Sequence, residues 1–186
     1  MYQIGANFTT YNPLELFTKN QIVPSEIDNY FRKDTLTGYV HDMGAAMQGG
    51  IGGHAGLFSN SNDVAKIMQM YLQEGKYGSK TFFSKSTIDY FNTCYYCDDG
   101  NRRGLGFDKP QIDDSSPTCG CVPMSSFGHS GFTGTYVWGD PENKIVYVFL
   151  SNRTFPSMKN NKLSDNNIRT EIQRIIYDSL KWFKWK

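Results

Sequence analysis

Three histidines carry most of the side-chain chemistry that this sequence offers. His41 precedes Asp42, His54 follows two glycines, and His129 lies in the glycine-rich run Phe127–Gly134. Glycine neighbours allow the backbone to present N–H groups to a ligand, and a histidine adds a proton or a positive charge. His54 and His129 are therefore candidate functional residues. We expect the His41–Asp42 pair to be a structural hydrogen bond rather than a catalytic dyad.

The run around His129 also contains a serine. Gly128-His129-Ser130-Gly131 is similar to the G-x-S-x-G turn of hydrolase nucleophiles, but its second glycine comes one residue early and a strand follows. Ser130 is therefore not expected to be a nucleophile. The H-E-x-x-H, G-x-G-x-x-G and Walker patterns are absent from the sequence, and we predict no cofactor.

Four cysteines form two close pairs, Cys94 with Cys97 and Cys119 with Cys121. Two such pairs in one short region are similar to a four-cysteine zinc site, although the second pair is closer than zinc ligands usually are. Two disulfides or free thiols fit the same spacing. The three alternatives stay open, with free thiols or disulfides favoured over a metal.

The composition is that of an ordinary folded chain. Of 186 residues, 39% are hydrophobic and 15% aromatic, and 19 basic residues balance 18 acidic ones. These values argue against disorder and against a charged surface for nucleic acid or anionic membranes. The longest apolar run, Ile145–Leu150, is too short to span a bilayer. No signal peptide follows Met1, so we expect either a cytoplasmic protein or a chain whose start is missing.

The first half of the chain is predicted to be mostly helix and loop. Residues 1–40 are rich in turn-forming residues and are expected to be irregular, and residues 41–58 are predicted to form a closely packed glycine-rich loop. A helix is expected from the N-cap Asn60 to Gly75, and a shorter helix is expected after Ser84.

The second half is predicted to contain the sheet. Residues 93–125 look like an excursion that holds a short strand at 104–107. A hairpin follows, with strands at 131–139 and 144–151 joined by an Asp-Pro turn. The last of these strands is apolar on both faces, which predicts a central position in the sheet.

The chain ends in a predicted helix that Ser164 or Asp165 caps. Its expected buried stripe consists of Ile168, Ile172, Ile175, Ile176, Leu180 and Phe183. One helix on an antiparallel sheet of about three strands predicts an α+β fold, with helix and loop in 1–100 and the sheet and last helix in 101–186. Such a sheet has one bare face and therefore looks incomplete.

Several motifs, in their order along the chain, resemble the serine β-lactamase-related proteins, which comprise class C β-lactamases, penicillin-binding DD-peptidases and related esterases. The motifs are Gly38–Asp42, Gly49–Ser59, Arg102–Asp108, Ser126–Thr135, Asp140–Glu142 and Phe149–Arg153. The resemblance implies a partial β-lactamase/transpeptidase-like fold in which residues 1–186 are the C-terminal portion of one domain. It also implies a serine hydrolase that cleaves an amide or ester through an acyl-enzyme, with a small molecule or a cell-wall peptide as substrate.

In that family, S-x-x-K supplies the nucleophile, Y-x-N assists proton transfer, and K-T-G or H-[ST]-G flanks the substrate. Only the third motif is present, as His129-Ser130-Gly131. The resemblance implies that His129 supplies charge or a proton relay, that Ser130 hydrogen-bonds a substrate carboxylate or carbonyl, and that the Phe132 N–H is an oxyanion-hole donor. The residues implied at the site are His129, Ser130, Gly131 and Phe132 for catalysis and His54, Thr133 and Gly134 for substrate binding.

The nucleophile motif is the missing part. S-x-x-K occurs nowhere in the sequence, and Tyr90-Phe91-Asn92 matches Y-x-N by letters only, because it comes after the glycine-rich loop. We therefore expect Met1 to be an internal residue of a longer protein, periplasmic or extracellular by resemblance, whose upstream segment carries the serine and further strands. This chain alone would then be inactive or nearly so.

Alternatives to an enzyme remain. The chain could be a non-catalytic module that binds a cell-wall peptide or a partner. In either case the incomplete sheet predicts that an upstream segment or a second copy covers it. H-S-G in place of K-T-G exchanges a permanent cation for a titratable one, so lactam, peptide and ester substrates all stay open.

Overall fold

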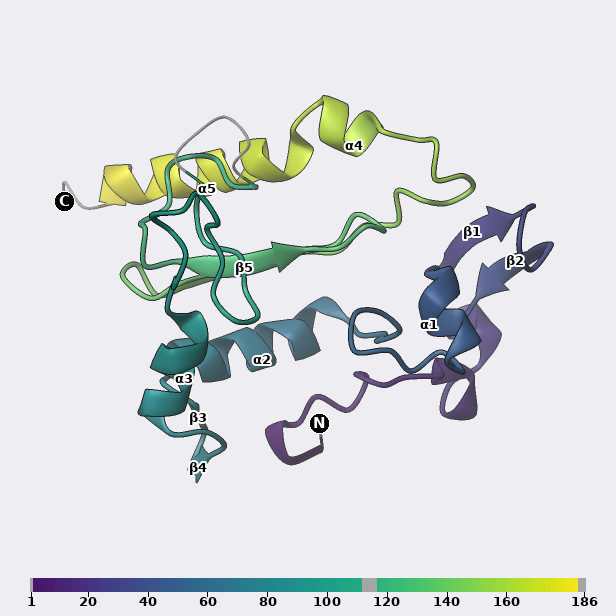
Figure 1. The fold of residues 1–186 in the computed structure, drawn as a ribbon, viewed down its shortest axis with the longest axis horizontal. Helices are drawn as coiled ribbons and strands as arrows, with labels where there is room; N and C mark the ends of the chain where they lie inside the picture. Colours follow the sequence, from purple (N-terminus) through teal and green to yellow (C-terminus); the bar gives the residue numbers. More distant parts are fainter. Residues whose placement is uncertain (1, 112–116, 184–186) are drawn as a thin grey trace.

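A three-stranded antiparallel sheet forms the centre of the protein (Figure 1). The computed structural model describes residues 2–111 and 117–183. In spatial order, the strands of this sheet are β5 (Phe127–Ser130), β6 (Tyr136–Asp140) and β7 (Ile145–Phe149). The helix α2 (Ser61–Leu72) lies on one face of the sheet and α5 (Ile168–Phe183) lies on the other. The chain therefore has the expected α+β fold.

Smaller elements surround this centre. Two short antiparallel hairpins are β1 (Pro24–Asp28) with β2 (Asp34–Thr37), and β3 (Lys76–Tyr77) with β4 (Lys80–Thr81). The other helices are α1 (Met43–Met47), α3 (Lys85–Asn92), α4 (Lys162–Asp165) and the 3-10 turns Tyr2–Ile4, Pro13–Glu15 and Lys19–Gln21. In Figure 1, residues 23–47, which include β1, β2 and α1, lie together beyond one end of the sheet, and we call them the N-terminal group. Every helix in the described ranges is too short or too polar to cross a bilayer.

Two of the three predicted helix starts are confirmed. The third is wrong, because Ser164 and Asp165 lie within α4 and the last helix begins at Ile168. The Asn60 side chain accepts a hydrogen bond from the Asp63 N–H at the start of α2, and the Ser84 side chain accepts one from the Thr87 N–H at the start of α3. Each cap satisfies a backbone donor that the first helical turn leaves unpaired. The prediction of an irregular segment at 1–40 was wrong in part, because β1 and β2 pair within it.

An aromatic cluster joins the sheet to α5. The rings of Tyr136 and Trp138 stack at 5.8 Å between centroids, Tyr147 packs against Tyr136, and Tyr177 from α5 completes the buried group. The Tyr177 hydroxyl donates to the buried Asp140 carboxylate at 2.5 Å. Burial raises the pKa of Tyr136 and of Tyr177. This hydrogen bond fixes α5 against the turn between β6 and β7.

The predicted face of the last helix was wrong in part. The helix divides at Asn167, whose φ is 51°, and the side chains that α5 buries are Gln173 and Tyr177, with Ile176 and Leu180 beside them. The exposed face carries Ile168, Ile172 and Ile175, and the side chain of Phe183 lies outside the described part. The hydrogen bonds of Gln173 and Tyr177 determine which face of α5 is buried. The spacing of apolar residues in the sequence contains no signal for these bonds.

Three expectations about the sheet need correction. The segment 104–107 is a turn, closed by a hydrogen bond from the Gly104 N–H to the Phe107 carbonyl, and the third strand is β5. The face predicted to be bare is covered by α2. The strand β7 pairs only with β6 in the described residues and is therefore an edge strand. It is apolar on both faces because a helix covers each of them.

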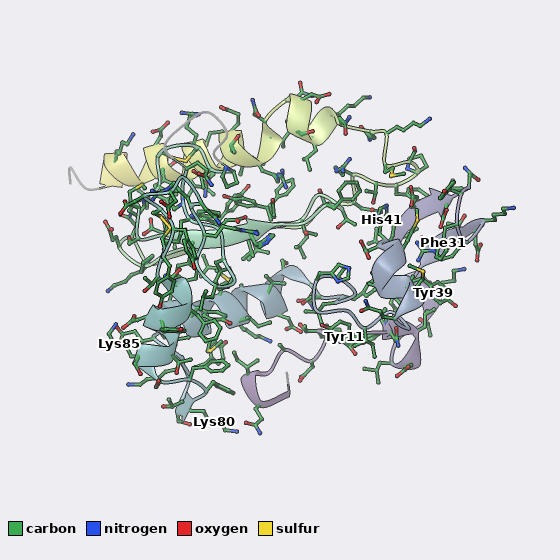
Figure 2. All side chains as sticks on the ribbon, in the orientation of Figure 1. Tyr11, Phe31, Tyr39, His41, Lys80 and Lys85 are labelled. Atoms are coloured by element: carbon green, nitrogen blue, oxygen red, sulfur yellow. A yellow bond between two sulfur atoms is a disulfide. The ribbon has the colours of Figure 1, made fainter. Side chains whose placement is uncertain are left out.

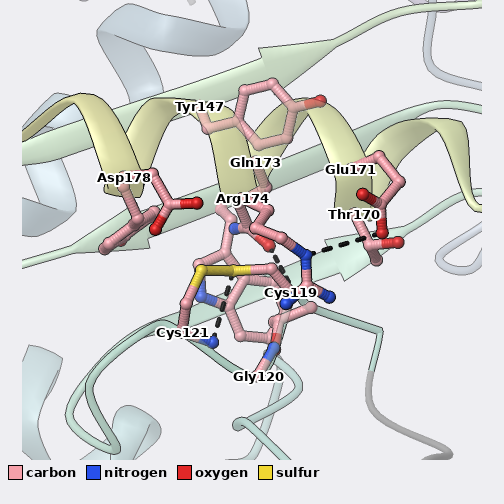
Figure 3. Close-up of a disulfide and its surroundings, with 12 residues drawn as sticks. Cys119, Gly120, Cys121, Tyr147, Thr170, Glu171, Gln173, Arg174 and Asp178 are labelled. Carbon is pink, nitrogen blue, oxygen red and sulfur yellow. Dashed lines mark hydrogen bonds and ion pairs between the residues drawn. A yellow bond between two sulfur atoms is a disulfide. The ribbon is translucent and has the colours of Figure 1, made fainter.

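Both cysteine pairs are disulfides, Cys94–Cys97 and Cys119–Cys121. Figure 3 shows the second disulfide beside α5, where the buried Gln173 side chain accepts a hydrogen bond from the Cys119 N–H at 3.0 Å. The disulfide alternative is therefore the one that the structure shows. The free-thiol alternative and the four-cysteine zinc site are wrong, because all four sulfur atoms are used.

Lys109 is buried beside the sheet, with 6% of its surface exposed. Its ammonium donates to the Asn92 side chain at 3.2 Å and to the Ser125 carbonyl at 3.1 Å, and lies 5.6 Å from the Phe127 ring centroid. Burial, together with the charge of Arg102, lowers the pKa of Lys109 to about 8.

This buried lysine predicts a rise of stability with pH. The pKa of Lys109 is lower in the folded state than in the unfolded state, so the unfolded chain binds more protons between about pH 8 and 9, below the range in which unfolded tyrosines ionise. The free energy of unfolding, measured with urea, should therefore increase across that window. The increase should disappear in Lys109→Met and persist in a variant of an exposed lysine, Lys80→Met. A wild-type stability that is flat or falling over this window would contradict the prediction.

Candidate active site

The strand β5 carries the H-S-G motif at the edge of the central sheet. It pairs with β6 over Phe127–Ser130, with His129 opposite Val137. A Cβ atom at Gly128 would collide with the Val137 carbonyl and the Trp138 ring. Only glycine therefore allows β5 to approach β6 closely at this position, and the close approach sets where His129 lies.

His129 is exposed and makes two hydrogen bonds through its ring. Nδ1 lies 2.7 Å from the Ser130 carbonyl oxygen, and Nε2 lies 3.0 Å from Nη2 of Arg103. Nε of Arg103 in turn donates to the Asp108 carboxylate at 2.6 Å. Sequence reasoning did not identify Arg103, although it lies within one of the motifs that carry the resemblance.

The loop between β5 and β6 is closed by its own backbone. The Gly131 N–H donates to the Thr135 carbonyl at 2.8 Å, and the Gly134 N–H donates to the Gly131 carbonyl at 2.9 Å. Gly134 has a φ of 101° and packs against Ser151, whose hydroxyl donates to the Gly134 carbonyl. The requirement for glycine at position 134 is therefore conformational.

Arg153 holds this loop from outside. Its backbone N–H donates to the Thr133 carbonyl at 3.0 Å and its side-chain Nε donates to the Phe132 carbonyl at 2.8 Å. Its guanidinium carbon lies 4.5 Å from the centroid of the Phe132 ring, and Nη1 donates to the carbonyls of Met158 and Asn160. Arg153 therefore anchors the loop to the segment at 158–160.

The Phe132 N–H has no hydrogen-bond acceptor among the described residues, whereas the Phe132 carbonyl is taken by Arg153. The Phe132 ring lies against His41, with 5.3 Å between the ring centroids. The loop is thus fixed in place while one of its amide donors stays available. An available, fixed N–H is the feature that stabilises a developing oxyanion.

His41 is positioned by β1 and by the segment after β2. Its Nε2 lies 3.1 Å from the Glu26 carboxylate without hydrogen-bond geometry, and its carbonyl accepts from Arg32 at 2.8 Å. Arg32 is held by Asp28, whose pKa is lowered because its carboxylate accepts several backbone N–H groups. Figure 2 shows His41 beside α1, where the N-terminal group meets the end of the sheet. The predicted His41–Asp42 hydrogen bond is therefore wrong.

Asp42 pairs with His54 instead, at 3.0 Å between Oδ1 and Nε2. The same oxygen accepts from the Ala45 N–H at 2.7 Å and caps α1. These two contacts, the Ala45 N–H first, lower the pKa of Asp42. His54 therefore braces the cap of a short helix, and the glycines around it allow the chain to fold back onto Asp42.

A cleft of about 1280 Å³ lies between the N-terminal group and the end of the sheet. Of the seven residues predicted at the site, four line this cleft, namely His54, Gly131, Phe132 and Thr133. His129, Ser130 and Gly134 are not among its lining residues, whereas His41 and Asp42 are. The structure thus brings the loop and His54 to one cleft, and places His129 at the adjoining strand edge.

The segment 152–154, which follows β7 and which we call the strap, joins the far wall of the cleft to the sheet. Asn152 donates through its side chain to the Pro24 carbonyl, and the Thr154 hydroxyl donates to the Ser25 carbonyl at 2.7 Å. These bonds connect residues more than a hundred positions apart. The strap therefore fixes the width of the cleft.

Three comparisons with known proteins show what this chain is similar to. The sequence model of the family described as "Beta-lactamase" matches residues 18–169. Relatives from Salmonella enteritidis and Salmonella typhi, each named "Putative D-alanyl-D-alanine carboxypeptidase", are 34% identical over 176 residues, which cover 88% of this chain and 40% of each relative. This chain thus spans about 40% of their length. A crystal structure of a beta-lactamase (Mb2281c) from Mycobacterium bovis matches with a TM-score of 0.44 and 22% identity, over 60% of this chain and 46% of that one.

The contacts of Arg153 predict how the loop responds to its removal. Arg153→Ala should speed hydrogen exchange of the Gly131 and Gly134 amides, because the Phe132 carbonyl loses its side-chain donor and the Phe132 ring loses the guanidinium that packs on it. A loss of about 1.4 kcal/mol of local stability would increase the exchange rate of these amides roughly tenfold. Arg153→Lys should give a smaller change, since lysine keeps the charge but not the forked geometry. Arg174→Ala on α5 is the control, and unchanged exchange in Arg153→Ala would contradict the prediction.

Proposed function

Because this chain belongs to the β-lactamase family, we propose that it forms the substrate-side wall of an acyl-transferring serine hydrolase site. The observation that carries the proposal is the Phe132 N–H, which has no acceptor in the described residues while the loop around it is fixed. The H-S-G motif adjoins it on β5, and the cleft opens beside it. In this proposal residues 1–186 are the C-terminal portion of one β-lactamase-like domain.

The proposed reaction is acyl transfer through a serine ester. A serine oxygen attacks the substrate carbonyl, and its proton passes to the lysine of S-x-x-K. The negative charge that develops on the carbonyl oxygen is stabilised by the Phe132 N–H, a contribution of about 3–4 kcal/mol in comparable sites. When the tetrahedral intermediate collapses, the C–N or C–O bond to the leaving group breaks, and the amine or alcohol departs with the proton that the lysine held. Water then attacks the serine ester, the bond between the acyl carbon and the serine oxygen breaks, and the acid product leaves as the serine regains a proton. Because S-x-x-K is absent from this sequence, we propose that another segment supplies both residues.

The remaining site residues are proposed to orient the substrate. The Ser130 hydroxyl, at the end of β5, would hydrogen-bond the substrate carboxylate or carbonyl. Thr133 lines the cleft beside Phe132, and His54 would contact the substrate across it. The name of the Salmonella relatives favours a cell-wall peptide that ends in D-alanine over a simple ester.

A non-catalytic module is the second candidate, and exposed apolar side chains favour it. Val23, Tyr30 and Met47 in the N-terminal group are 67%, 81% and 74% exposed. The outer edge of β7 has no strand partner among the described residues. Exposed apolar side chains and an unpaired strand edge promote association.

This surface predicts that the isolated chain self-associates. We expect a dimer or larger species in light scattering, and exposed charges introduced by Val23→Lys with Met47→Lys should shift it toward a monomer. Lys76→Glu, at an exposed position away from this surface, is the control. A wild-type chain that stays monomeric would count against an uncovered surface.

The catalytic proposal is tested by adding the missing segment. The sequence upstream of Met1 should encode S-x-x-K followed by Y-x-N, and its product, mixed with this chain, should hydrolyse a fluorescent penicillin or a p-nitrophenyl ester. Each part alone should be inactive. Failure of the mixture, or an upstream sequence without S-x-x-K, would favour the binding module. Turnover by this chain alone that Ser130→Ala abolishes would overturn the assignment of the nucleophile.

The oxyanion donor is tested by a matched pair of variants. Phe132→Pro removes the N–H and should lower kcat of the assembled enzyme by roughly 10²–10³-fold. Phe132→Ala keeps the N–H and loses only the ring, so it should retain most of the activity. Equal losses in the two variants would show that the ring, and not the amide, matters.

A further inference from the structure

The two contacts of the His129 ring determine which nitrogen carries the proton. Nδ1 faces the Ser130 carbonyl at 2.7 Å, and a carbonyl only accepts, so Nδ1 donates. Nε2 faces the Arg103 guanidinium at 3.0 Å, and a guanidinium only donates, so Nε2 accepts. A neutral imidazole with its hydrogen on Nδ1 satisfies both contacts.

The other two states of the ring conflict with these partners. A neutral ring with its hydrogen on Nε2 would direct an N–H at the guanidinium and a lone pair at the Ser130 carbonyl. An imidazolium would direct an N–H at the guanidinium and place two positive charges in contact. Each of these states loses at least one of the two hydrogen bonds.

Arg103 is held in place independently of His129. Its Nε donates to the Asp108 carboxylate at 2.6 Å. The Asp108 backbone pairs with Gly128 in both directions, at 2.8 and 3.1 Å, and Gly128 directly precedes His129 on β5. The turn that carries Arg103 is therefore attached to the same strand as the histidine, so the arginine and the ring keep a fixed separation.

We propose that Arg103 is a positioning residue of the site, which holds His129 as the neutral Nδ1–H imidazole and provides a permanent positive charge beside it. The catalytic meaning of this proposal rests on the proposed function, whereas the state of the ring does not. Of the two roles implied for His129, charge and proton relay, the charge belongs to Arg103, because a guanidinium stays protonated at any working pH. His129 keeps a hydrogen-bonding role, because Arg103 occupies its Nε2 lone pair and a proton taken up there would face the guanidinium.

The state of the ring is tested on the full chain by ¹⁵N NMR of the imidazole nitrogens at a pH where the histidines are neutral. In the wild type we expect a protonated Nδ1 and an unprotonated Nε2 whose resonance is shielded by the hydrogen bond from Arg103. Arg103→Met should shift the Nε2 resonance downfield toward that of a free nitrogen, and Arg103→Lys should give an intermediate shift. Arg103 is 51% exposed, so these variants should fold.

Arg102→Met is the matched control, because it removes the same charge from the neighbouring position, where Nε bonds the Pro110 carbonyl instead. Its Nε2 shift should stay close to that of the wild type. A protonated Nε2 in the wild type, no downfield shift in Arg103→Met, or an equal shift in Arg102→Met would each overturn the proposal. If Arg103→Met failed to fold, the wild-type spectrum and Arg103→Lys would still decide it.

The catalytic part of the proposal is tested separately, by steady-state kinetics of the enzyme assembled from this chain and the upstream segment. Arg103→Met should lower kcat/KM, because the charge beside the substrate and the fixed orientation of His129 are both lost, and Arg103→Lys, which keeps the charge, should restore part of the loss. Turnover in Arg103→Met equal to that of the wild type would overturn the positioning role. If the wild-type assembly shows no turnover, the proposed function fails, and the NMR result still decides the state of His129.

Discussion

Arg153 takes up the carbonyl groups of the loop after β5, and the geometry of the candidate site depends on this constraint. With the Thr133 and Phe132 carbonyls bonded to Arg153, and the Gly131 carbonyl bonded to the Gly134 N–H, the loop has few ways to rearrange. The Phe132 N–H stays without an acceptor in the described residues. A donor that is both fixed and unpaired costs no reorganisation when negative charge develops beside it.

The same constraint joins three distant parts of the chain. The Arg153 guanidinium packs on the Phe132 ring and donates a hydrogen bond to the Met158 carbonyl. The His41 ring, which belongs to the N-terminal group, also packs against the Phe132 ring. The strap through Asn152 and Thr154 holds that group to the end of the sheet. A change in any of these segments would therefore alter the loop without touching the H-S-G motif.

The sequence predicted correctly those features that depend on interactions between residues close together in the chain. The caps at Asn60 and Ser84 were predictable because a side-chain oxygen needs only the next turn of its own helix. The buried face of α5 was not, because it depends on hydrogen bonds from the Cys119 N–H to Gln173 and from the Tyr177 hydroxyl to Asp140, across 54 and 37 positions of sequence. A helix with apolar residues on more than one side gives no periodicity signal that separates these faces.

In the candidate site, too, the sequence indicated some features, whereas others depend on residues that are distant in the chain. The glycine-rich run at 49–56 indicated the closely packed segment around His54, since close packing and left-handed backbone require glycine. The loop at 131–134 was not predicted, because 131–139 was expected to be a strand and β6 begins only at Tyr136. The partners of the histidines could not be read from adjacency: His41 lies against Glu26, Asp42 holds His54, and the sequence neighbour of His41 is not its partner. Strand pairing and the strap, not spacing, bring these groups together.

The position of His129 outside the cleft lining limits how a substrate can lie. The cleft is lined by Gly131, Phe132 and Thr133, whereas His129 and Ser130 belong to the strand that leads into them. In the proposed site, a substrate that uses both would therefore cross Gly131, with its reacting carbonyl near the Phe132 N–H and its remaining part along β5. On the proposed path the substrate would meet a neutral imidazole and the positive charge of Arg103, whose Nη2 lies 3.0 Å from Nε2 of His129. The proposed site thus holds its permanent charge outside the H-S-G motif, whereas a lysine would place that charge within the motif.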